Sequence, residues 1–140
     1  MRSLRRFVWA GVHDCPGGYH QAILFDSQKW KFGTSNPVEF GPTPYHGGLW
    51  ATFTQTTTKA PLAVGVYHLP PNVVASQAAQ HGYLQGFLDK APKVNARIAG
   101  GDGADASSWA AGWQDARIIA TTSPNRAAGT YDGGKSIKDR

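Results

Sequence analysis

The chain has 140 residues, of which 41% are hydrophobic and 16% are charged, so it can bury a core and lacks the composition of a disordered protein. A single cysteine, Cys15, excludes an internal disulfide and argues against a structural zinc site. The net charge of +5 favours an anionic partner, but the basic residues form no dense stripe, so nucleic acid is not the expected partner.

The first half of the chain has the pattern of short β-strands separated by turns. The predicted strands are 7–12, 19–25, 30–32, 49–58 and 62–69. Alternating polarity in 19–25 predicts a hairpin with 30–32 across a turn at 26–28. The Pro- and Gly-rich stretch 36–48 is predicted to be a loop.

The second half is predicted to hold two helices. The first begins at Pro70-Pro71-Asn72 and ends before Pro92, and a short strand at 93–99 follows it. The second begins near Asp102 or Asp105, either of which can accept hydrogen bonds from the free N–H groups of the first turn. A last strand is predicted at 117–121.

These elements predict one α+β domain over residues 1–122, in which a small antiparallel sheet is packed by two helices. Residues 123–140 are rich in Gly, Ser and charge and are predicted to form a loose tail. The apolar runs are too short to span a bilayer, and no Sec-type signal is visible. We therefore expect a cytoplasmic protein, or one exported by a signal-independent system.

The histidines are the first candidates for chemistry. None of the five has the spacing of a helical metal site, and no metal or cofactor is expected. The glycine-rich segment 99–103 could present N–H groups to an anion, but it lacks the Lys-Ser/Thr of a phosphate-binding loop.

His20 opens the segment Tyr19-His20-Gln21-Ala22-Ile23-Leu24-Phe25, which runs through a turn into Trp30-Lys31-Phe32-Gly33. This resembles the histidine-bearing hairpin of the NlpC-type, circularly permuted papain-like thiol amidohydrolases. The resemblance implies a papain-like core, in which a thiolate at a helix N-terminus attacks an amide carbon and His20 acts as general base. It implies a bacterial peptidoglycan amidase or secreted effector, with a cognate immunity protein as a further partner.

The sequence departs from that family where the nucleophile should stand. Gly103 or Ala104 occupies its place, next to Asp102, so either an inactivating substitution is present or the protein is a natural non-enzyme. Cys15 is an alternative nucleophile, and the ring-orienting residue is Thr34, Ser35 or His68. The candidate catalytic residues are His20, Asp102, Gly103, Ala104, Cys15 and His68.

A second resemblance rests on Val66-Tyr67-His68-Leu69-Pro70 and on Ala96-Arg97-Ile98-Ala99-Gly100-Gly101. These segments are similar to those of CheD-type glutamine deamidases, although the cysteine of that family is again missing. Outside both families, the alternative is a phage or bacterial anti-defence or immunity-type binding module that captures an anionic ligand or a partner protein through the glycine loop.

Overall fold

The computed structural model describes residues 6–15, 19–41, 46–71, 75–102 and 112–113. The elements are β1 (Phe7–Cys15), β2 (Tyr19–Asp26), β3 (Trp30–Glu39), β4 (Gly47–Gln55), β5 (Pro61–His68), α1 (Gln77–Asp89) and β6 (Ala96–Asp102). All of them lie in a unit formed by Met1–Ala110, and Ala111–Arg140 form a second unit. The predicted last strand and tail lie outside the described residues, as does nearly all of the predicted second helix.

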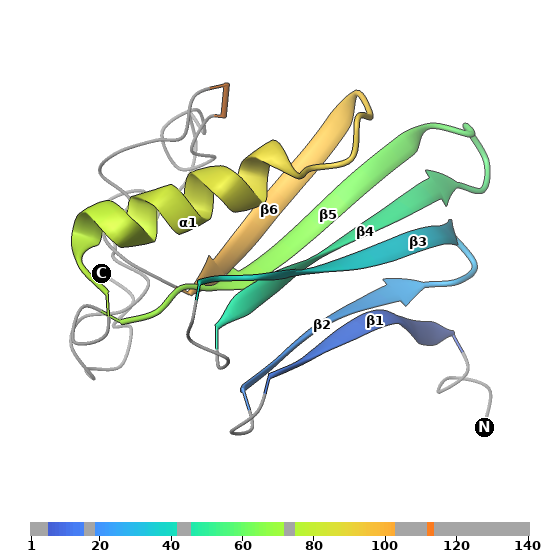
Figure 1. The fold of residues 1–140 in the computed structure, drawn as a ribbon. Helices are drawn as coiled ribbons and strands as arrows, with labels where there is room; N and C mark the ends of the chain where they lie inside the picture. The colour runs from blue at the N-terminus through green and yellow to red at the C-terminus, as the bar shows by residue number, and fades with distance from the viewer. Residues whose placement is uncertain (1–5, 16–18, 42–45, 72–74, 103–111, 114–140) are drawn as a thin grey trace, which may run out of the picture. The chain divides into compact units, whose positions relative to one another are not determined.

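The strands form two sheets (Figure 1). β1 and β2 pair as an antiparallel hairpin, and β3, β4, β5 and β6 pair in that order. The predicted hairpin between residues 19–25 and 30–32 is therefore wrong, because the turn between them connects two different sheets. The predicted loop at 36–48 is also wrong in its first part, because β3 continues to Glu39. Pro37 is tolerated there because β3 is an edge strand.

The larger sheet is mixed, because β6 runs parallel to β5. Parallel neighbours need a crossover connection, and α1 provides it between these two strands. The prediction of an antiparallel sheet packed by two helices in a papain-like core is wrong: the described residues form two sheets, one of them mixed, and one helix.

The helix begins later than its proline signal predicts. Ser76 is the N-cap, and its Oγ accepts a hydrogen bond from the Ala79 N–H at 3.3 Å. The helix ends at Asp89, three residues before Pro92. A serine cap satisfies one of the N–H groups that have no partner inside the helix, so it determines the start more closely than the upstream prolines do.

The hairpin covers one face of the larger sheet. Ala10 and Ile23 from the hairpin form a buried cluster with Leu49, Ala51 and Phe53 of β4. The three β4 residues alternate along the strand, so their side chains share one face. Burial of these apolar side chains between the two sheets holds the hairpin in place.

The helix packs on the opposite face of the larger sheet. Trp50 is 1% exposed, and its ring stacks on Phe87 with centroids 4.9 Å apart. Its Nε1–H donates to the Phe87 carbonyl oxygen at 2.9 Å, which satisfies the polar atom of a buried indole. Gly65 makes room for this ring, because a Cβ there would lie 2.8 Å from the Trp50 Cη2 atom.

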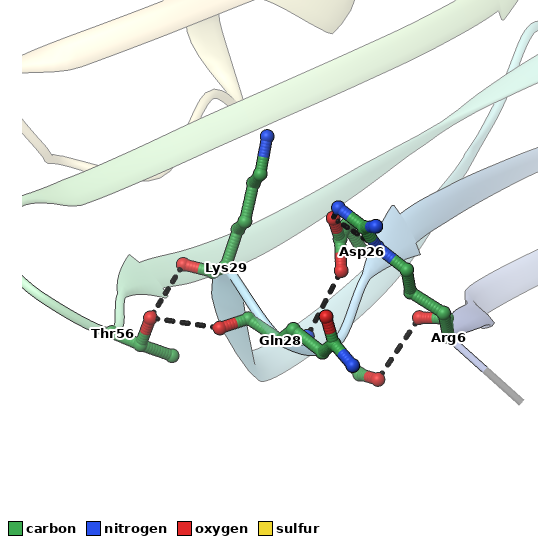
Figure 2. A network of polar contacts seen from close by, with 6 residues as sticks. Arg6, Asp26, Gln28, Lys29 and Thr56 are labelled. Carbon is green, nitrogen blue, oxygen red and sulfur yellow. Dashed lines mark hydrogen bonds and ion pairs between the residues drawn. The ribbon is translucent and has the colours of Figure 1, made fainter. Parts of the chain in front are cut away.

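A polar network closes the end of the hairpin that carries the β2–β3 turn (Figure 2). We call this group the turn edge; its residues are Arg6, Asp26, Gln28, Lys29 and Thr56. The Arg6 guanidinium binds the Asp26 carboxylate at 2.5 Å, and Asp26 also accepts from the Gln28 N–H at 3.0 Å. Thr56 Oγ1 lies 3.0 and 3.1 Å from the carbonyl oxygens of Gln28 and Lys29. The network thus ties the turn to both sheets.

Candidate functional site

Two residues of types used in catalysis are paired in register where β5 and β6 end. His68 and Asp102 are the last residues of these parallel strands and are partners in register. Because the two strands are parallel, both finish at the same end of the sheet (Figure 1). Ligands of sheets with parallel strands commonly bind beyond the carboxyl ends of those strands. The backbone positions of a histidine and an aspartate therefore meet at the end of the sheet where ligands commonly bind.

His46 lies beside His68. Their ring centroids are 4.9 Å apart, and His46 is 8% exposed while His68 is half-buried. Burial lowers the pKa of His46 below its ordinary value of 6.5, and the neighbouring His68 lowers it further. His46 therefore favours its neutral form.

A third histidine ring approaches the same end of the sheet from the hairpin. The His13 ring packs against the backbone of Gly47, the register partner of His68, so closely that a Cβ on Gly47 would clash with it. His13 is buried, and its Nδ1 lies 2.8 Å from Oε1 of Gln21. We call the group formed by His13, His46, Gly47, His68 and Asp102 the carboxyl edge.

The tip of the hairpin lies next to this edge. His20 begins β2 and pairs with Asp14, one register position beyond the pair of His13 and Gln21. Its Nδ1 lies 3.0 Å from Oδ1 of Asp14, and both side chains are exposed. A carboxylate at Nδ1 fixes the ring and leaves Nε2 directed elsewhere, which is the arrangement of an oriented histidine base.

The predicted site residues are only partly brought together. His68 and Asp102 meet in register, whereas His20 belongs to the hairpin tip. Cys15 is the last residue of β1, and Gly103 and Ala104 lie outside the described residues, so the predicted approach of His20 to them stays a prediction.

Asp102, predicted beside a helix start, is the last residue of β6, and whether a helix follows lies outside the described residues. Thr34 and Ser35 lie on β3, which β4 separates from β5. The residue that contacts the His20 ring is instead Asp14.

Sequence reasoning missed His46 and the pair of His13 and Gln21. His46 lies within the stretch 36–48 that was predicted to be a loop, and no spacing rule links it to His68, 22 residues further on. The one local signal is Gly47-Gly48, because glycines inside a strand mark a close approach of other groups.

The described residues offer no ready metal centre. Histidine and carboxylate are metal-ligand types, but no group of three or more His, Cys, Asp or Glu that could hold an ion occurs in the described ranges.

Among the helices of those ranges, none is long and apolar enough to cross a membrane.

No family model matches the chain, and no curated protein sequence matches it. Among solved structures, it is similar to D. rerio TDP2 complexed with a single strand DNA product, with 23% identity and a TM-score of 0.52 over 71% of this chain and 40% of that chain. It is also similar to D. rerio TDP2 humanized by 14 mutations, with 24% identity and a TM-score of 0.51 over 69% of this chain and 41% of that chain. A third similar structure is the human Nocturnin catalytic domain with bound sulfate anion, with 12% identity and a TM-score of 0.49 over 61% and 37% of the two chains.

These likenesses concern the fold alone, and the chain spans about two fifths of each TDP2 structure. The fold of this chain is similar to part of the fold of these TDP2 structures. The prediction of a papain-like, NlpC-type or CheD-type thiol amidohydrolase is therefore wrong, and so is the peptidoglycan substrate. The fold gives no support to the alternative anti-defence or immunity-type binding module, nor to a cognate immunity protein.

The expectation that nucleic acid is not the partner also conflicts with these neighbours, because one of the TDP2 structures holds single strand DNA. That expectation depended on the absence of a dense basic stripe along the sequence. The ends of neighbouring strands bring together residues from separate segments of the chain. A continuous run of basic residues in the sequence is therefore not needed to form a binding site. The thiol-hydrolase interpretation failed for a related reason: a histidine at the start of a strand, followed by a turn and another strand, is compatible with many sheets.

Proposed function

We propose that the chain forms part of a nucleic-acid-processing phosphoesterase domain, with the substrate phosphate bound at the carboxyl edge. The observation that carries this proposal is the register pairing of His68 with Asp102 at the ends of two parallel strands. The similarity of the fold to TDP2, in one case complexed with a single strand DNA product, supports nucleic acid as the substrate class. The net charge of +5 favours a polyanion as well.

The two side chains have complementary chemistry for phosphoester hydrolysis. The imidazole of His68 can donate an N–H hydrogen bond to a phosphate oxygen. The Asp102 carboxylate can accept a proton from the attacking water as the new P–O bond forms. The bond to the leaving oxygen then breaks, and that oxygen takes its proton from solvent or from an imidazole. Hydrolysis thus needs water as the only co-reactant.

The test uses the full chain and a fluorescently labelled single-stranded DNA. Binding is followed by anisotropy at increasing salt, and cleavage is followed on denaturing gels with and without an added divalent cation. We expect binding that weakens steeply with salt, because phosphate contacts release counterions. Asp102→Asn and His68→Ala should each lower cleavage by about 10²-fold or more, the size expected for loss of an acid–base group.

Asp89→Asn is the matched control for Asp102→Asn. Asp89 is the last residue of α1 and accepts a hydrogen bond from Gln85. The chain after it leads to the start of β6, at the end of the strand opposite to Asp102. This variant should bind and cleave as the parent does. Cleavage that persists in both site variants would place the chemistry elsewhere, and absence of DNA binding at low salt would contradict the proposed substrate class.

A further inference from the structure

We propose that His46 is a positioning residue for His68, which holds the His68 imidazole at the carboxyl edge through contact between the two rings. This inference rests on the proposed function, in which His68 contacts the substrate phosphate. Its geometry, however, belongs to the unliganded protein and can be tested without any substrate.

The His46 ring is a fixed support. It is 8% exposed, so its rotamers are limited by the surrounding atoms. Its carbonyl oxygen accepts a hydrogen bond from the Phe40 N–H at 3.2 Å, which ties its backbone to the end of β3. A residue fixed at both backbone and side chain can restrict whatever packs against it.

The contact with His68 has the geometry of two packed rings. The centroids lie 4.9 Å apart, and the ring planes are inclined by 48°. His68 is the more exposed of the two, and it is the last residue of its strand. A side chain at the end of a strand can adopt several rotamers, and a ligand that fixes it must offset the lost entropy. A buried ring packed against one side of His68 limits those rotamers beforehand, so less entropy is lost when a ligand binds.

A second layer supports this arrangement from the hairpin. The His13 ring packs on Gly47, which follows His46 in the chain and pairs with His68 across the strands. The contact of His13 with Gln21 fixes that ring in turn. His46 is thus attached to a backbone segment that cannot shift without disturbing the hairpin contact.

The charge state of His46 suits this role. Burial and the nearby His68 lower the pKa of His46, so the pair carries at most one positive charge near neutral pH. A neutral His46 therefore adds no positive charge beside the His68 ring. Two further titratable residues of the described ranges stand beside the pair: the ring of His13 from β1 packs at Gly47, and Asp102 is the register partner of His68 on β6.

The experiment compares His46→Ala, which removes the ring, with His46→Phe, which keeps a buried ring without nitrogens. The readouts are the dissociation constant for labelled single-stranded DNA, and the titration of the His68 Cε1 proton by NMR, assigned with His68→Ala. His46→Ala should weaken DNA binding by about tenfold, since small displacements of a contacting group are costly, and should alter the His68 signal. His46→Phe should bind within about twofold of the parent, and its His68 signal should stay closer to that of the parent than the signal in His46→Ala does.

Each outcome decides the matter. Equal losses in both variants would overturn the proposal, because the His46 nitrogens would then contact substrate themselves. Parent-like binding and an unchanged His68 signal in both would overturn it too. If the parent binds no DNA, the proposed function fails, while the NMR comparison of Ala and Phe still tests the ring contact. If His46→Ala does not fold, His46→Leu replaces it, because leucine fills the space without a ring.

Discussion

The two edges of this molecule are built on different physical principles. The turn edge is closed by partly exposed groups that already have partners: Arg6 binds Asp26, and the Thr56 hydroxyl binds backbone carbonyl oxygens of the turn. At the carboxyl edge, buried or half-buried rings lie against a glycine backbone, and the register brings His68 and Asp102 together. The polar groups of the turn edge are occupied by one another and so serve the fold. At the carboxyl edge, a buried ring supports the half-buried His68 at the end of its strand, where a ligand can reach it. The contrast predicts that substitutions at the turn edge affect stability alone, and that substitutions at the carboxyl edge affect stability and binding together.

The largest effect is expected from Gly47→Ala. A Cβ at this position would clash with the His13 ring and would lie 2.7 Å from the Val38 carbonyl oxygen. Forcing atoms into such a site costs about 1–3 kcal/mol. We expect a loss of that size in the free energy of unfolding, measured by urea denaturation, and weaker DNA binding as His68 shifts.

Gly100→Ala is the matched control, because a Cβ there meets no atom within 4 Å. This variant should be neutral or gain up to about 1 kcal/mol, since alanine reduces the freedom of the unfolded chain. Equal destabilisation of the two variants would show that the close packing of His13 on Gly47 is not what makes position 47 sensitive.

A smaller effect is expected from Asp26→Asn at the turn edge. The substitution removes the carboxylate that binds the Arg6 guanidinium. Because Arg6 is partly exposed, we expect the variant to melt at a slightly lower temperature than the parent. Added salt should reduce this difference, because it screens the ion pair that only the parent has. DNA binding should be unchanged, and a clear loss of binding would show that the two edges are not functionally separate.

The contrast between the edges also explains which features could be predicted from sequence. Strand segments such as 62–69 were located well because alternation and β-branched residues are local signals. Strand pairing was not, because the turn after Asp26 looks the same whether its flanking strands pair or enter different sheets. His68 and Asp102 could be singled out separately, but their meeting depends on β6 returning beside β5. His46 gave no local signal, since its neighbour in space is distant in the chain.

The subtlest prediction is that the two edges lose their contributions in different pH windows. The hydrogen bond from Arg6 lowers the pKa of Asp26 below its ordinary value of 3.8, so this contribution is complete above that pH and is lost as the pH falls through the lowered value. The pKa of His46 is lowered from 6.5 by burial, so the unfolded chain takes up its proton first, and stability declines as the pH drops below 6.5. Denaturation at a series of pH values should show a decline below 6.5 that His46→Phe removes. A second decline, below 3.8, should be removed by Asp26→Asn. If His46→Phe left the upper decline unchanged, the other histidines would be its source, and the carboxyl edge would lack the buried neutral imidazole that distinguishes it from the turn edge.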